Sequence, residues 1–256
     1  MNLEHPPHTA RVLGLVYSAG CYLVFLCTCV YLIGFVGEIG VPKHINDGPP
    51  GEWPTAVLID TALIMLFGAQ HTVMARRGFK QWLAGFIPTP VERSTYVLLS
   101  SLVLGLMFWL WQPITASVWT VEAAWADALL MGLFWLGWGI ALLATFLINH
   151  FELFGLKQAI DRWRKPTSQP PVFTTPLFYK LVRHPLYLGF LIAFWATPHM
   201  TAGHLLFAVG MTVYVFIGAR FEEKDLVTLF GERYRRYQQE VAMIIPGPKP
   251  PKKPKN

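Results

Sequence analysis

Residues 124–149 read AWADALLMGLFWLGWGIALLATFLIN, and Asp127 is the one ionisable side chain in this run. An α-helix rises about 1.5 Å per residue, so a run of this length exceeds the ~30 Å hydrocarbon core of a bilayer. The stretch therefore predicts a membrane-spanning helix and sets the class of the whole chain.

Other apolar runs lie on both sides of it, and 54% of the 256 residues are hydrophobic while only 14% are charged. That balance excludes an ordinary soluble domain. The run that starts at 183 is short, because the stretch from Pro185 to Pro198 gives roughly 21 Å of helix. We expect an all-α, polytopic integral membrane helical bundle with five to six transmembrane helices. The further runs are 11–37, 54–75, 94–113, 183–198 and 202–221.

The segment after the last run has a different pattern. Leu226, Phe230, Tyr234 and Tyr237 recur at helical spacing within residues 222–243, which predicts an amphipathic cytoplasmic helix. The chain has no long linker, so residues 1–245 are predicted to form one integral membrane domain. Residues 246–256 (PGPKPPKKPKN) are predicted to be a disordered basic tail.

Basic residues fix a predicted orientation. When the six runs are threaded through a membrane, 20 of the 21 Lys and Arg residues fall on one side and Lys43 falls on the other. Basic loops stay in the cytoplasm, so both termini are predicted to be cytoplasmic, with the protein in a bacterial inner membrane. The net charge of +6 then reflects orientation and attraction to anionic membrane lipid, not a nucleic-acid partner.

Ionisable and amide side chains gather at the predicted cytoplasmic ends of five runs. Polar groups near a membrane are costly unless paired or functional, so we expect a shared site in the cytoplasmic leaflet. The alternative is that each group only marks a helix boundary. No metal site is predicted, because Cys21, Cys27 and Cys29 lie in one run without a completing histidine. The polar groups are Gln70 and His71, Glu92 and Arg93, Asn149, His150 and Glu152, His184, and Arg220, Glu222 and Glu223.

The most specific local pattern is RHPLYLG at 183–189. Pro185 is suited to a first helical turn, which puts His184 at the cap beside free backbone amides. Gly189 permits close approach of a ligand or a neighbouring helix. Downstream, the adjacent carboxylates Glu222 and Glu223 oppose the macrodipole at a helix end unless a cation compensates them. Arg220 or Lys224 could do so, and a bound cationic ligand is the sharper interpretation.

Together with EEKDLVTLFGERYRRY at 222–237, this pattern resembles the C-terminal signature of the isoprenylcysteine carboxyl methyltransferase-like membrane methyltransferases. The segments QHTVMARRGFKQW, FWLWQP and NHFELFGLKQ resemble the nurim/NnrU-type branch, and the resemblance covers about residues 55 to 241. It implies an S-adenosylmethionine-dependent S-methyltransferase of the EC 2.1.1 class. The implied acceptor is a small volatile or lipophilic thiol, methanethiol above all, which would give dimethyl sulfide.

The resemblance implies that the Arg-His-Pro and Glu-Glu…Tyr-x-x-Tyr elements enclose S-adenosylmethionine, and we assign polar groups at other helix ends to the methyl acceptor. The acceptor side is assigned to His71, Arg93, Asn149, His150 and Glu152, with His71 or His150 available to take the thiol proton. The donor side, which encloses S-adenosylmethionine, is assigned to His184, Pro185, Tyr187, Leu188, Gly189, Arg220, Glu222, Glu223, Tyr234 and Tyr237.

Three alternatives remain open at the level of sequence. The acceptor could be another lipophilic thiol or a lipid. The protein could instead bind haem or quinone with His71 and His150 as axial ligands, although the nearby carboxylates and Arg disfavour a dry haem pocket. It could also be a non-catalytic membrane protein that keeps the fold without the chemistry.

Overall fold

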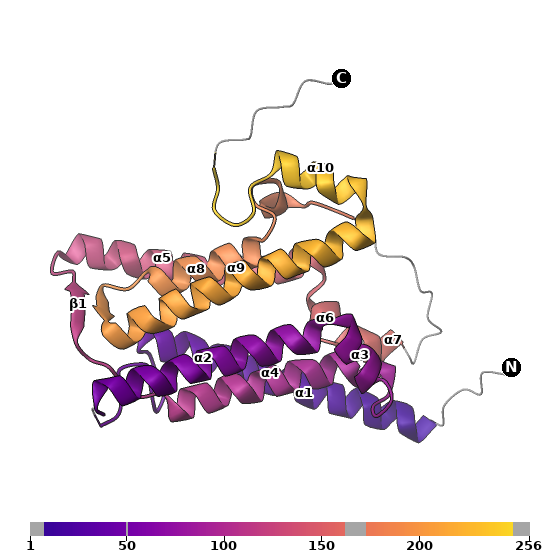
Figure 1. The fold of residues 1–256 in the computed structure, drawn as a ribbon, viewed down its shortest axis with the longest axis horizontal. Helices are drawn as coiled ribbons and strands as arrows, with labels where there is room; N and C mark the ends of the chain where they lie inside the picture. The colour runs from indigo at the N-terminus through magenta and orange to yellow at the C-terminus, as the bar shows by residue number, and fades with distance from the viewer. Residues whose placement is uncertain (1–7, 50, 162–172, 248–256) are drawn as a thin grey trace, which may run out of the picture. The chain divides into compact units, whose positions relative to one another are not determined.

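A computed structural model describes residues 8–49, 51–161 and 173–247 of the chain. The predicted disorder of the tail therefore falls, from residue 248 on, outside the described residues. The chain divides into two compact units, which are described separately below (Figure 1). The first comprises residues 1–115 and 149–169, and the second comprises residues 116–148 and 170–256.

The first unit is helical throughout its regular structure. The helix α4 packs against both α1 and α2, and the short α7 packs against α1 and α4. Its elements are α1 (His8–Gly37), α2 (Trp53–Ala75), α3 (Arg77–Leu83), α4 (Thr89–Leu110), α6 (His150–Leu153) and α7 (Leu156–Asp161).

The helix α4 is shifted toward the N-terminus relative to the predicted 94–113. It begins at Thr89, where a proline stands in the first turn and Glu92 complements the positive end of the helix dipole. It ends at Leu110, with Trp111 in a non-helical conformation as its C-cap. The apolar pattern did not reveal the polar first turn, so the predicted start was late.

The C-terminal end of α4 is held by two charged side chains from other segments. The ammonium group of Lys43 donates to the carbonyl oxygens of Trp109 at 2.6 Å and Trp111 at 2.8 Å. The fully buried Asp60 of α2 accepts from the backbone amide of Gln112 at 2.9 Å. A lysine at the negative end of a helix satisfies carbonyls that lack partners within the helix. This accounts for the single basic residue on the predicted outer side.

Replacing Lys43 by methionine is expected to lower the stability of the protein by about 1–3 kcal/mol, because two helix-end carbonyls lose their donor. Thermal unfolding in detergent, followed by circular dichroism, measures the change. The matched control is Lys180→Met, which removes an exposed lysine at the end of a 3-10 helix. Equal unfolding temperatures for the two variants would contradict the capping role of Lys43.

The second unit combines helices with a short antiparallel strand pair. The strands pair Ser117 with Thr201 and Thr120 with His199. The helix α8 packs mainly against α5 and also against α9, and α10 packs against α9. The elements are β1 (Ser117–Thr120), α5 (Ala124–Ile148), η1 (Leu177–Lys180), α8 (Pro185–Trp195), β2 (His199–Thr201), α9 (Ala202–Phe230) and α10 (Glu232–Glu240).

The last long helix differs from its predicted bounds. The sequence predicted a span at 202–221 followed by a separate helix at 222–243, whereas α9 continues without interruption to Phe230. No proline or glycine interrupts residues 222–230, so the helix has no local reason to stop. The break comes at Gly231, whose φ of 57° suits glycine, and the amphipathic segment that follows is only α10.

Two glycines bring α5 and α8 into close contact. A Cβ atom built on Gly189 would lie 2.6 Å from the backbone nitrogen of Ala141 and 2.6 Å from the carbonyl oxygen of Gly137. A Cβ on Gly137 would in turn lie 2.7 Å from the carbonyl oxygen of Gly189. Small residues at such crossings let membrane helices pack backbone to backbone.

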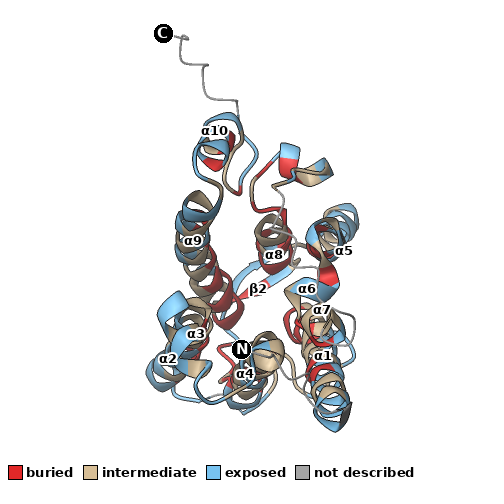
Figure 2. Ribbon diagram, turned by 90° about the vertical axis from the view of Figure 1, so that its right-hand side faces the viewer, coloured by how far each residue is buried: buried red, intermediate tan, exposed pale blue. Residues whose placement is uncertain are grey.

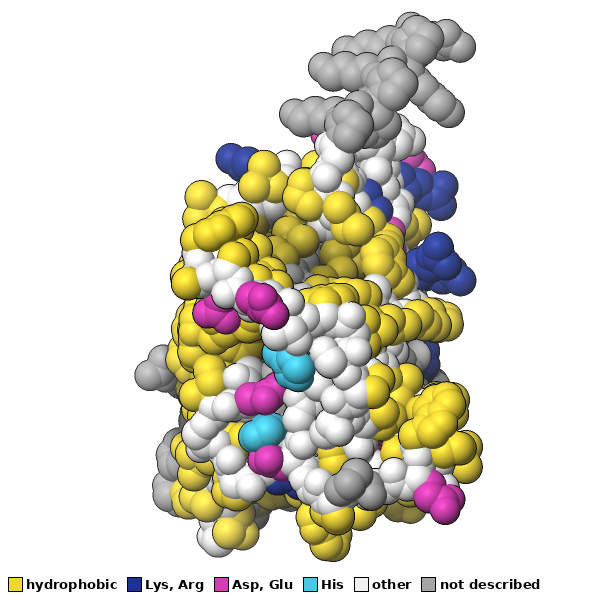
Figure 3. Space-filling view, turned by 90° about the vertical axis from the view of Figure 1, so that its left-hand side faces the viewer, with side chains coloured by type: hydrophobic (Ala, Val, Ile, Leu, Met, Phe, Trp, Pro, Cys, Tyr) yellow, Lys and Arg dark blue, Asp and Glu magenta, His cyan; other side chains and the backbone are white. Residues whose placement is uncertain are grey.

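Within the described residues, five helices are long and apolar enough to cross a membrane. The prediction of a polytopic helical membrane bundle is thereby confirmed. Large apolar side chains are exposed along the helices, as lipid contact requires, including Trp109, Trp135 and Leu143. Figure 2 shows exposed positions on each long helix, whereas the end of the molecule drawn in Figure 3 carries acidic and histidine side chains among the hydrophobic ones. The fifth run forms the short helix α8, which does not reach the length of a span.

Candidate functional site

The start of α8 is fixed by proline and by the C-terminal segment of the chain. Pro185 occupies the first helical turn and His184 is the N-cap, which confirms the predicted helix start. The backbone amide of Arg183 donates to the carbonyl of Ala242 at 2.8 Å, and that of His184 donates to Met243 at 3.0 Å. The segment after α10 therefore pairs with the segment before α8 and holds the RHP element in place.

Glu223 is the centre of a buried polar network. Its Oε1 accepts from Arg183 Nε at 2.5 Å and from His184 Nε2 at 3.2 Å, and its Oε2 accepts from Gln238 Nε2 at 2.9 Å. Arg183 Nη1 also donates to the carbonyl oxygens of Gln238, at 3.0 Å, and Val241. The side chains of Arg183 and Glu223 are 9% and 10% exposed. Both oxygens of Glu223 are thus occupied by contacts within the protein, and these contacts link His184 and α10 to α9.

Glu222 occupies a different environment on the next position of the same helix. Its side chain is 46% exposed, and Oε2 accepts from the Tyr187 hydroxyl at 2.9 Å. The Nδ1 atom of His184 lies 3.5 Å from the same oxygen, and the imidazole stacks on the Tyr187 ring with centroids 5.3 Å apart. Glu222 therefore presents an accessible carboxylate beside an aromatic pair, an arrangement suited to a cationic ligand.

The two tyrosines of α10 point into the protein. The Tyr237 hydroxyl donates to the carbonyl oxygen of Tyr179 at 2.5 Å, and burial raises the pKa of Tyr237 to about 12. Tyr234 is 2% exposed, and burial raises its pKa as well. No hydrogen-bond partner for the Tyr234 hydroxyl lies among the described residues. A buried hydroxyl without a partner is costly, so this group is available to a polar ligand.

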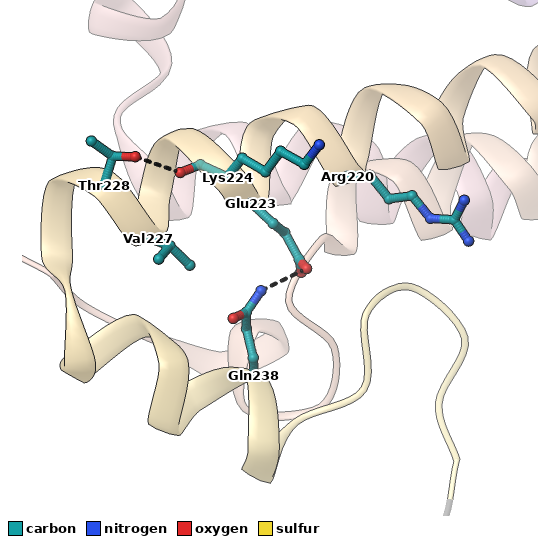
Figure 4. Close-up of a pocket in the computed structure, with 6 residues that line it drawn as sticks. All are labelled: Arg220, Glu223, Lys224, Val227, Thr228 and Gln238. Carbon is teal, nitrogen blue, oxygen red and sulfur yellow. Dashed lines mark hydrogen bonds between the residues drawn. The ribbon is translucent and has the colours of Figure 1, made fainter.

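A groove of about 510 Å³ runs along the last turns of α9 beside α10. In Figure 4, Glu223 and Gln238 point toward one another from the two helices, whereas Lys224 and Arg220 extend along α9. The positive charges of Arg220 and Lys224 make this groove suitable for an anionic group, such as a carboxylate. The lining residues are Arg220, Glu223, Lys224, Val227, Thr228 and Gln238.

All five residues predicted for the acceptor side belong to the first unit, and all ten predicted for the donor side belong to the second. Within the first unit, Arg93 donates from Nε to the carbonyl oxygen of Leu153 at 2.7 Å. The ring of Tyr96 contacts both Arg93 and His71. Its centroid lies 5.1 Å from the guanidinium of Arg93 and 4.9 Å from the ring of His71. Arg93, Tyr96 and His71 thus form one contact group.

His150 and Glu152 belong to other contacts of that unit. The Nε2 atom of His150 lies 2.6 Å from the hydroxyl of Tyr22. Glu152 Oε2 accepts from Asn149 Nδ2 at 2.7 Å and from Lys157 Nζ at 2.8 Å, and Asn149 also caps the short helix α6 through the Glu152 amide. The Asn149 and Glu152 side chains thus contact each other, whereas His150 pairs with a tyrosine from α1.

Several partners of these residues were not predicted, and three of them make close polar contacts with Glu223 or His150. Arg183 and Gln238 bind Glu223, and Tyr22 binds His150. Arg183 belongs to the RHP pattern and Gln238 directly follows Tyr237. Each lies next to an assigned residue, and that position could have suggested it. Tyr22 lies inside an apolar run, where a tyrosine is ordinary, and no sequence signal marks it.

Burial lowers the pKa of His150 from its usual 6.5. The pKa of His150 is lower in the folded state than in the unfolded state. Neutral His150 therefore contributes its full share of stability at pH values above the unfolded-state pKa. That stability falls as the pH falls below it, since the unfolded chain then binds the proton more readily. We expect wild type to lose more thermal stability than His150→Phe between about pH 7 and pH 5. Unfolding temperatures measured across that range test this, and parallel curves for the two proteins would refute it.

Comparison with known proteins supplies the family. The NnrU protein family model matches residues 59–245. The chain is 63% identical to a methanethiol S-methyltransferase of Pseudomonas sp. (strain GM41(2012)), over 93% of this chain and 92% of that protein. It is 58% identical to one of Pseudomonas deceptionensis, over 94% and 92%, and 25% identical to nurim of Bos taurus, over 87% and 89%.

No solved structure matches the chain significantly. The family match covers most of α2 and all of α4, α5, α8, α9 and α10, and with them the RHP element and the two carboxylates at 222 and 223. The predicted resemblance is confirmed, and this chain belongs to the NnrU protein family.

Proposed function

We propose that the protein is an S-adenosylmethionine-dependent methyltransferase that converts methanethiol to dimethyl sulfide. The observation that carries the proposal is the 63% identity, over 93% of the chain, to a relative with the name methanethiol S-methyltransferase. The polar centre of the second unit supports it, because it combines an accessible carboxylate, an aromatic pair and a buried tyrosine hydroxyl without a described partner.

The donor-side residues fit a ligand with a positively charged sulfur and an amino-acid end. Glu222 offers negative charge and Tyr187 holds that carboxylate in place. Arg220 and Lys224 offer positive charge to a carboxylate. When bound, S-adenosylmethionine supplies an electrophilic methyl group. The ten donor-side residues named from the sequence are retained, with Glu223 acting through His184 as a positioning residue and not by direct contact.

On the acceptor side, the protein must remove a proton from the thiol, since the thiolate is the nucleophile. We propose that His150 or His71 takes this proton. Burial lowers the pKa of His150, which keeps the imidazole neutral near pH 7 and able to accept a proton. Arg93, Asn149 and Glu152 are proposed to hold the surrounding helix ends through the contacts described above.

We further propose that both termini are cytoplasmic and that membrane lipid surrounds the long helices. The asymmetry of the basic residues supports the orientation. Exposed Trp, Leu and Phe side chains along the helices support lipid contact. Cysteine labelling at engineered positions in the 41–54 loop and near residue 240, in intact cells, measures the orientation, and labelling of the second position alone by an impermeant reagent would contradict it.

Donor binding tests the proposed function. We expect calorimetry to detect S-adenosylmethionine binding by purified protein, and Glu222→Gln to weaken it about tenfold, because one unit of facing charge is lost. The matched control is Glu232→Gln, which removes a carboxylate whose side chain is 85% exposed on α10. Absence of binding by wild type, or equal affinities for wild type and Glu222→Gln, would count against the assigned donor site.

A further inference from the structure

A second cavity of about 130 Å³ lies in the second unit, apart from the charged groove of α9. It is formed by α5, by η1 and the residues after it, by the first turn of α8 and by the C-terminal segment. Every side chain that lines it is apolar. The residues are Ile140, Phe178, Leu181, Val182, Pro185, Leu188 and Pro246.

The cavity shares the first turn of α8 with the polar centre. Pro185 directly follows His184, and Leu188 directly follows Tyr187, whose hydroxyl binds Glu222. The close crossing at Gly189 brings α5 against this turn, which places Ile140 in the opposite wall. The apolar space therefore adjoins the residues assigned to the methyl donor.

The lining determines which ligands the cavity accepts. A charged or strongly polar group would lose its water without gaining a hydrogen bond, so an apolar ligand is favoured. A cavity of roughly 150 Å³ lined by Leu, Ile and Phe in another protein stays dry and binds benzene. The space of about 130 Å³ is large enough for an alkyl group of a few carbons, and it is open beside Leu181, which is 65% exposed.

We propose that this cavity holds the alkyl group of the thiol acceptor and limits its length. The proposal rests on the proposed function, since it requires methyl transfer to a thiol. The apolar walls disfavour thiols with charged substituents, because desolvation of the charge is not compensated there. The limited volume favours short, unbranched alkyl groups.

Two variants change the size of the cavity without touching the assigned donor residues. Phe178→Ala enlarges it, and Ile140→Phe fills it. One methylene in an apolar pocket changes selectivity by roughly tenfold or more. We expect Phe178→Ala to raise kcat/KM for propanethiol relative to methanethiol by about that factor. We expect Ile140→Phe to raise the KM for methanethiol and to leave the affinity for S-adenosylmethionine unchanged.

The matched controls are Leu177→Ala and Leu142→Phe. Both replace exposed leucines, one beside Phe178 and the other on α5 near Ile140, and neither side chain lines the cavity. We expect both controls to keep the wild-type ratio of propanethiol to methanethiol turnover. Circular dichroism establishes that each variant is folded, and if Phe178→Ala does not fold, Ile140→Phe decides the matter.

The outcomes separate this inference from the proposed function. If wild type methylates no thiol, the proposed function fails. If wild type is active but both cavity variants keep the wild-type ratio and KM, the cavity inference is wrong and the function stands. If the variants instead weaken S-adenosylmethionine binding at an unchanged ratio, the cavity belongs to the donor. An acyl chain as the occupant would likewise leave the ratio unchanged and overturn the inference.

Discussion

Replacing Glu223 by alanine is expected to destabilise the protein by about 3–5 kcal/mol, the usual cost of removing one partner from a buried ion pair. The change leaves Arg183, His184 and Gln238 without their shared acceptor in a site where the arginine side chain is 9% exposed. It also releases α10 from α9. Thermal unfolding in detergent, followed by circular dichroism, measures the loss.

The neighbouring carboxylate gives a close control. Glu222→Ala removes a side chain that is 46% exposed, so the expected stability loss is at most about 1 kcal/mol. Donor affinity is predicted to fall more in Glu222→Ala than in Glu223→Ala, because Glu222 is proposed to contact the ligand whereas both oxygens of Glu223 bind groups within the protein. Equal stability losses for the two variants would show that Glu223 does not organise the site.

Gly189→Ala is expected to cost roughly 3 kcal/mol, which is large for one methyl group. The added Cβ would lie 2.6 Å from the backbone nitrogen of Ala141 and 3.0 Å from its Cα. Both contacts are backbone atoms of α5, so no side-chain rotation relieves them, and the helices must separate. The measurement is again thermal unfolding, compared with wild type under the same conditions.

Gly139→Ala is the matched control on α5, because nothing lies within 4 Å of the added Cβ there. Alanine favours a helix over glycine by about 1 kcal/mol, so this control is expected to be neutral or stabilising. If Gly189→Ala were as stable as Gly139→Ala, the close crossing of α5 and α8 would be wrong. The inference about the neighbouring cavity would lose its support at the same time.

The sequence predicted the membrane fold well because lipid imposes a simple rule. A span must be long, apolar and helical, and runs such as 124–149 satisfy that rule in one dimension. Helix ends were harder. The first turn of α4 is polar, and the charged residues 222–225 interrupt the apolar run of α9, so α4 was predicted to start late and α9 to stop early.

The candidate site was predictable where its residues share a short pattern. His184, Pro185 and the pair of carboxylates could be named from the sequence, and the structure brings His184 and both carboxylates together. The different environments of Glu222 and Glu223 could not be predicted, because they depend on Arg183 and Gln238 reaching the same carboxylate from two other segments. The cavity at Ile140 and Phe178 was equally hidden, since its walls are ordinary apolar residues from separate elements.

The most direct measurement is transfer of a labelled methyl group from S-adenosylmethionine to methanethiol by the purified protein, with dimethyl sulfide collected from the headspace. We expect labelled dimethyl sulfide from wild type and a signal at least roughly a hundredfold lower from His184→Ala, because a misplaced donor is no longer aligned with the thiol. The variant His199→Ala, which changes an exposed residue of strand β2, is expected to match wild type. Equal rates of labelled product from wild type and His184→Ala would contradict the assigned donor site. No product from either protein would contradict the proposed function.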